Sequence, residues 1–115
     1  MNKFLISKTL KSLGFKPKYC GYVYLREAIK MVTDDFTLIN AFEKVIYSTI
    51  GDKYGVYYKT ICADITYAIT KAFKECKNKK LWDEIFSRER EIRPANNEFI
   101  PAVADYIMLQ GEDEK

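Results

Sequence analysis

The sequence predicts an all-α domain of about six helices that includes a helix-turn-helix. Apolar residues recur at helical spacing along the 115 residues, and no stretch alternates between apolar and polar with period two. Nearly half of the residues (48%) are apolar and only five are Gly, which is typical of one helical core. We expect a single domain over residues 1–110, followed by an acidic, disordered tail at 111–115.

The first three helices are predicted over residues 2–13, 21–32 and 37–54. Gly14 ends the first helix, because glycine tolerates the left-handed conformation that follows a helix terminus. Pro17 lies in the connection, and the second helix finishes near Asp34. We expect the third helix to bury its periodic apolar positions, Leu38, Phe42, Val45, Ile46 and Ile50.

Three further helices complete the predicted domain. The fourth, over residues 57–77, has an apolar stripe at Ile61, Ile65, Ala68, Ile69, Ala72 and Phe73. A short fifth helix contains Leu81, Trp82, Ile85 and Phe86. After the break at Arg93-Pro94, Asn96 or Asn97 is expected to cap the last helix, with Pro101 in its first turn. Its expected buried positions are Phe99, Val103, Ile107 and Leu109.

The segment 45–73 has the spacing of a helix-turn-helix. Gly51 is small where two helices cross closely, and Gly55 can adopt the positive φ that the turn requires. Ile61 supplies a branched side chain that packs the second helix against the first. In such motifs the second helix lies in the DNA major groove.

Composition excludes several classes of function. The chain has no His, and its three Cys have no metal-binding spacing, so we expect no enzyme, metal or cofactor. The N-terminal region lacks a long apolar run, so we expect no membrane span and a cytoplasmic protein. Two lysine clusters favour a nucleic-acid partner, although lysines also occur on ordinary solvated helices: Lys3, Lys8, Lys11, Lys16 and Lys18, then Lys71, Lys74, Lys77, Lys79 and Lys80.

Three segments together resemble one protein family. They are residues 21–32 (GYVYLREAIKMV), the helix-turn-helix with Lys53-Tyr54 and Ala68-Ile69, and residues 94–100 (PANNEFI) with 103–105 (VAD). In this order they resemble the C-terminal effector domain of the response regulator that initiates sporulation in endospore-forming Firmicutes. The resemblance implies a six-helix fold and sequence-specific binding to double-stranded DNA, often as tandem copies.

Two departures from the family pattern affect the expected function. The chain begins with Met1 just before the effector domain, so we expect no receiver domain and no phosphorylation switch. The family contacts bases through a Glu and two Arg, whereas the alignment places Cys62, Ala63 and Thr66 there. An Arg that forms a bidentate pair with guanine contributes about 1–3 kcal/mol of discrimination, which neither Ala63 nor Thr66 can supply. We therefore expect altered or weakened base specificity.

The candidate interface has two groups of residues. Base contacts are expected from Lys59, Cys62, Ala63, Thr66, Tyr67 and Thr70. Phosphate contacts are expected from Tyr57, Lys71, Lys74 and Arg93. The alternative for the first group is an ordinary solvated helix face.

A second hypothesis is a protein-interaction module that modulates a full-length sporulation regulator without contacting DNA. Tyrosines suit an interface because they supply contact area at low entropic cost: Tyr19, Tyr22, Tyr24, Tyr57 and Tyr58. DNA binding instead predicts one positive face that unites the second helix of the motif with Lys71, Lys74 and Arg93. A second copy of the chain, in tandem or as a dimer on DNA, is a further partner that the resemblance implies.

Overall fold

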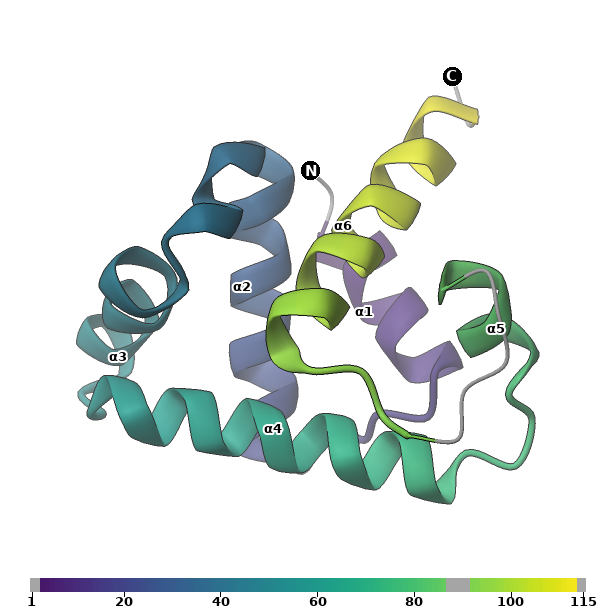
Figure 1. Ribbon diagram of the computed structural model, residues 1–115, viewed down its shortest axis with the longest axis horizontal. Coiled ribbons are helices and arrows are strands. Elements are labelled where there is room, and N and C mark those ends of the chain that lie inside the picture. Colours follow the sequence, from purple (N-terminus) through teal and green to yellow (C-terminus); the bar gives the residue numbers. More distant parts are fainter. Residues whose placement is uncertain (1–2, 87–91, 114–115) are drawn as a thin grey trace.

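The computed structural model describes residues 3–86 and 92–113 and is all-helical over these ranges, as predicted (Figure 1). α4 runs along one side of the molecule, and α2 and α6 stand across it (Figure 1). The predicted start of the first helix at residue 2 lies outside the described residues. The elements are α1 (Lys3–Ser12), α2 (Cys20–Asp34), the 3-10 helix η1 (Phe36–Asn40), the π-helix η2 (Phe42–Tyr47), α3 (Ser48–Tyr54), α4 (Tyr58–Glu75), α5 (Lys80–Phe86) and α6 (Asn96–Asp113).

The prediction of one continuous helix over residues 37–54 is wrong. Asp35 accepts hydrogen bonds from the backbone N–H (3.1 Å) and the hydroxyl (2.6 Å) of Thr37, which starts a tighter 3-10 turn. At Ala41 the backbone leaves the helical region (φ −142°, ψ 48°), and a π-helical turn follows. The wider π turn shifts the positions that face inward, so Val45 is 36% exposed although the 3.6-residue period predicts burial.

The last helix also differs from its prediction. The carbonyl of Ala95 accepts from the N–H groups of Glu98 (3.0 Å) and Phe99 (2.8 Å), so Ala95 precedes the helix and Asn96 lies inside it. Pro101 is the sixth helical residue, in the second turn. Leu109 is 52% exposed instead of buried. Because α6 continues to Asp113, the predicted tail is helical at residues 111–113, and residues 114–115 lie outside the described chain.

A close helix crossing brings α2 against α4 at Gly21. A Cβ atom at this position would lie 2.2 Å from the carbonyl oxygen of Asp64 and 2.6 Å from the Cβ of Ala68. Only glycine permits this approach without a shift of backbone. The contact fixes the start of α2 against the middle of α4, and sequence periodicity did not identify it.

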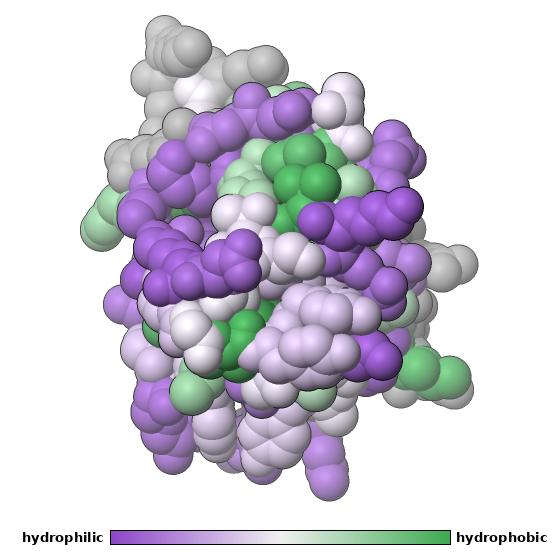
Figure 2. Space-filling model, turned by 90° about the vertical axis from the view of Figure 1, so that its left-hand side faces the viewer, coloured by the Kyte–Doolittle hydropathy of each residue, from purple (hydrophilic) through white to green (hydrophobic). Residues whose placement is uncertain are grey.

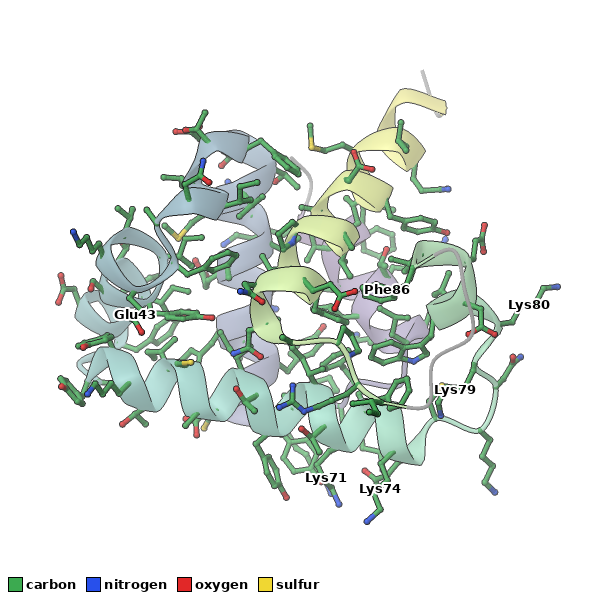
Figure 3. All side chains as sticks on the ribbon, viewed as in Figure 1. Glu43, Lys71, Lys74, Lys79, Lys80 and Phe86 are labelled. Carbon is green, nitrogen blue, oxygen red and sulfur yellow. The ribbon has the colours of Figure 1, made fainter. Side chains whose placement is uncertain are left out.

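An aromatic cluster closes the other end of the core. Trp82 of α5 is 1% exposed, and its indole N–H donates to the carbonyl of Leu13 (3.0 Å). The cluster joins α4, α5, α6 and the segment after α1, because Trp82 packs against rings from all of them: Phe15, Phe73, Phe86 and Phe99 (Phe86 is labelled in Figure 3). Gly14, at φ +100°, ends α1 beside this cluster, as predicted.

Candidate nucleic-acid interface

The turn between α3 and α4 depends on two glycines. Gly55 is left-handed (φ 68°, ψ 36°), as predicted, and its N–H bonds to the carbonyl of Gly51. Val56 donates to the same carbonyl at 2.8 Å. A Cβ at Gly51 would lie 2.4 Å from the carbonyl oxygen of Val56. The close approach at Gly51 therefore involves the turn itself, and not a crossing of two helices as the sequence predicted.

α4 buries one side and exposes the other. The predicted apolar stripe is confirmed, since all six of its residues are buried. The opposite side faces solvent, and Lys71 and Lys74 project from α4 away from the rest of the fold (Figure 3). We call six exposed residues along this side the exposed ridge: Lys59, Thr60, Ala63, Tyr67, Thr70 and Lys74. Glu75, at the end of α4, is exposed as well and pairs with Lys71. Four of the six predicted base-contacting residues lie on the ridge.

The other two, Cys62 and Thr66, are half-buried beside the ridge and bonded to α6. The side-chain amide of Asn96 donates to the hydroxyl of Thr66 (3.0 Å) and to the carbonyl of Cys62 (3.2 Å). The Thr66 hydroxyl in turn donates to the Cys62 carbonyl (2.9 Å). Both hydrogen-bonding functions of Thr66 are therefore used within the protein. The sequence alone does not indicate this role of Asn96, because an Asn before an amphipathic stretch is typical of a helix cap.

A shallow hollow of about 380 Å³ lies on this side of α4, which we call the α6 flank. Cys62, Thr66 and Asn96 line it, together with Arg93 and Glu43 (Glu43 is labelled in Figure 3). Tyr47 lies in its wall, where burial raises the pKa of its phenol to about 12, although the hydrogen bond from Asn96 acts in the opposite direction. The hollow therefore contains one cationic and one anionic side chain.

The predicted phosphate contacts do not form one cluster. Arg93 lies near Cys62 on the α6 flank. Lys71 follows Cys62 by nine residues, and at about 100° per residue this places Lys71 on the opposite side of the helix. Lys71 pairs with Glu75 at 3.7 Å, whereas Lys74 lies on the exposed ridge. We call the side of α4 that contains Lys71 and meets α2 the α2 flank. Arg93 and Lys71 therefore lie on opposite sides of α4, whereas Lys71 and Lys74, three residues apart, are neighbours on its surface.

The remaining candidate, Tyr57, precedes α4 in an extended conformation and is 61% exposed. Its ring contacts that of Tyr58 edge to face, with 4.9 Å between centroids. Two of the five tyrosines suggested for an interface, Tyr22 and Tyr24, are buried in the core. On the face formed by η1, η2 and α3, Figure 2 shows small hydrophobic areas divided by hydrophilic side chains.

Glu27 of α2 holds the first helix of the motif in place. Its carboxylate accepts from the ammonium of Lys53 (2.9 Å) and the hydroxyl of Tyr54 (3.3 Å), both in α3, and lies 3.9 Å from the ammonium of Lys3. Partial burial alone would raise the pKa of Glu27, but these hydrogen bonds and charges lower it below its usual value. Glu27 therefore makes its ion pairs within the protein, with Lys53 and Lys3.

The described residues contain no group of three His, Cys, Asp or Glu side chains able to hold a metal ion. In the same ranges, no helix has the length and apolar character needed to span a bilayer.

Comparison with known proteins places this helix-turn-helix in a family. Residues 6–107 match the family described as "Sporulation initiation factor Spo0A C terminal", a match that extends from α1 into α6. The chain belongs to this family. The Spo0A C-terminal family consists of DNA-binding effector domains of a transcription factor, and it is not a family of enzymes. The resemblance found in the sequence is thus confirmed, and double-stranded DNA is the partner that the family indicates.

Proposed function

We propose that this chain is a DNA-binding transcriptional regulator, and that it contacts the major groove through the exposed ridge of α4. Its base preference would differ from the one that the family pattern implies. The observation that supports it is the composition of the ridge, which has Lys59, Tyr67, Thr70 and Lys74 but no Arg or Glu. Threonine and lysine can each hydrogen-bond a base edge, but neither has the rigid planar fork with which Arg pairs with guanine.

Most of the affinity would come from phosphates and depend on salt. Lys74 is exposed on the ridge and no described carboxylate pairs with it, so it is the strongest of the phosphate candidates. Tyr57 and Arg93 would contact the backbone at the start of α4 and on the α6 flank. Lys71 would contribute less, because Glu75 already pairs with it. Cys62 and Thr66 would support the ridge through Asn96, and base contacts would come from their exposed neighbours. A cytoplasmic location would follow from DNA as the partner.

The test is binding of the purified protein to a DNA duplex with the sporulation regulator's site and to a scrambled duplex, measured by fluorescence anisotropy across a salt series. We expect similar affinity for both duplexes and a log–log slope of about −0.9 for each phosphate contacted. A strong preference for the family site would contradict the altered base preference. Absence of binding at low salt would refute DNA binding altogether.

A single variant with a matched control sharpens this test. Lys74→Gln should reduce the slope by about 0.9 and weaken binding to both duplexes equally. Lys8→Gln removes the same charge from α1, where Lys8 lies near Tyr106 and Gln110 of α6, and should leave the slope nearly unchanged. Equal slopes for the two variants would mean that Lys74 does not contact a phosphate.

The second candidate, a protein-interaction module, has one observation in its favour. Three tyrosines of the helix-turn-helix are well exposed: Tyr54 (39%), Tyr57 (61%) and Tyr67 (53%). This function would predict a complex with a full-length sporulation regulator in analytical ultracentrifugation, without binding to either duplex. Tyr67→Ala should then weaken that complex.

A further inference from the structure

The segment between α1 and α2 runs beside the candidate DNA-contacting helix. At its start, a Cβ on Gly14 would lie 3.4 Å from the Cβ of Cys76, at the end of α4. Midway, the ring of Tyr19 meets that of Tyr67 edge to face, with 5.9 Å between centroids. Just past its end, in the first turn of α2, a Cβ on Gly21 would lie 2.2 Å from the carbonyl oxygen of Asp64. Residues 14–21 therefore follow the α2 flank of α4 in the opposite direction, from its C-terminus to its middle.

The segment is held firmly in this position. Phe15 is 5% exposed and inserts its ring into the aromatic cluster around Trp82. The N–H of Tyr19 donates to the carbonyl of Lys16 (3.2 Å), which closes a turn around Pro17. Because both ends are packed and Pro17 restricts the backbone, binding would cost little ordering of the chain here.

The segment presents exposed positive charge next to the ridge. Lys16 and Lys18 are both exposed, and no carboxylate in residues 3–86 or 92–113 forms an ion pair with either. The ammonium of Lys18 lies 5.3 Å from the centroid of Tyr19, and that ring contacts Tyr67 of the ridge. No acidic residue occupies the first turn of α2, so its dipole adds to this positive field.

Two acids on the same flank do not cancel this charge. Glu75 is paired with Lys71, and Asp64 is half-buried nearer the middle of α4. The flank has three lysines, Lys16, Lys18 and Lys71, and these two carboxylates, so its net charge is positive even without the ridge lysines.

From this arrangement we infer that Lys16 and Lys18 form a second phosphate-binding surface, which contacts one DNA strand while α4 lies in the major groove. A groove about 12 Å wide just admits a helix, so elements packed beside that helix face the two phosphate strands that border the groove. The segment 14–21 faces one strand, and Arg93 on the α6 flank faces the other. This inference rests on the proposed DNA binding and adds an element that lies outside the helix-turn-helix.

The experiment compares the double variant K16Q/K18Q with the matched double variant K8Q/K30Q in the same anisotropy salt series. Both lose two charges, but Lys30 pairs with Asp34 in the last turns of α2, far from Gly21, and Lys8 lies near the C-terminal half of α6. We expect K16Q/K18Q to reduce the log–log slope by about 1.8. At 0.1 M salt the affinity should fall about eightfold for each lysine removed, and by the same factor for both duplexes. The control should keep the wild-type slope.

The outcomes separate the inference from the proposed function. Equal slopes for the two double variants, with clear binding by the wild type, would overturn the inference and leave DNA binding through α4 intact. Absence of binding by the wild type at low salt would refute the proposed function and the inference with it. Circular dichroism of each variant confirms that a lost contact, and not a lost fold, explains the change.

Discussion

Replacing Gly21 with Ala should destabilise the fold by forcing α2 and α4 apart. The new Cβ would lie 2.2 Å from the carbonyl oxygen of Asp64 and 2.6 Å from the Cβ of Ala68. Both distances are about 1 Å or more below van der Waals contact, and the first involves backbone, which cannot rotate away. The two helices must therefore separate by roughly 1 Å at their crossing.

The magnitude follows from two opposing effects. Overpacking in a close contact costs about 1–3 kcal/mol, and a clash with backbone lies toward the upper end. Alanine also favours the helix by about 0.5–1 kcal/mol over glycine. We therefore expect Gly21→Ala to lower the free energy of unfolding by about 2 kcal/mol, measured by urea denaturation with an unchanged m-value.

Cys20→Ala is the matched control for this variant. Cys20 is exposed and adjacent in the same turn of α2, so its replacement should change the free energy of unfolding by less than about 0.5 kcal/mol. A Gly21→Ala protein as stable as the wild type, or more stable, would refute the close crossing.

Three further predictions concern other parts of the fold. Gly55→Ala should lower the free energy of unfolding by about 1 kcal/mol through backbone strain alone, because Gly55 is left-handed (φ 68°) and an added Cβ would meet open space. Gly55→Asn should lower it less, because Asn tolerates this conformation better, and an equal loss for the two variants would contradict this cause. Trp82→Phe should cost about 1–3 kcal/mol in urea denaturation, because it leaves the buried carbonyl of Leu13 without its donor; a neutral effect would mean that this carbonyl is otherwise satisfied. Because the folded state lowers the pKa of Glu27, its ion pairs stabilise the protein above the ordinary pKa of 4.5 and this contribution is lost as the pH falls through the folded value. The stability difference between Glu27→Gln and the wild type at pH 7 should therefore shrink as the pH falls below 4.5, and a constant difference in urea midpoints would contradict the assignment.

Local signals predicted the helix-turn-helix well. The period of Ile61, Ile65 and Ile69 depends only on helical geometry, and these residues are buried as expected. Gly14 and Gly55 have the positive φ that their positions after helices predict. In each case the physical cause lies within a few residues of the signal, so the sequence alone contains it.

Tertiary contacts explain what the sequence did not predict. The polar side chain of Asn96 suits a helix cap, but its role is decided by Thr66, 30 residues away in the sequence. The break at Ala41 and the π turn after it interrupt a pattern that otherwise fits one helix. The approach of residues 14–21 to α4 likewise depends on Gly21, whose close contact has no signature in a single sequence.

The exposed ridge of α4 is the surface that we propose contacts DNA. The most direct measurement is an amide chemical-shift titration of the labelled 13.5 kDa protein with a DNA duplex at low salt. We predict that the largest shifts occur along α4 at Lys59, Ala63, Tyr67 and Thr70, with only small shifts in α5 and the C-terminal half of α6. Shifts concentrated in α5 or that half of α6, with α4 unchanged, would contradict the account.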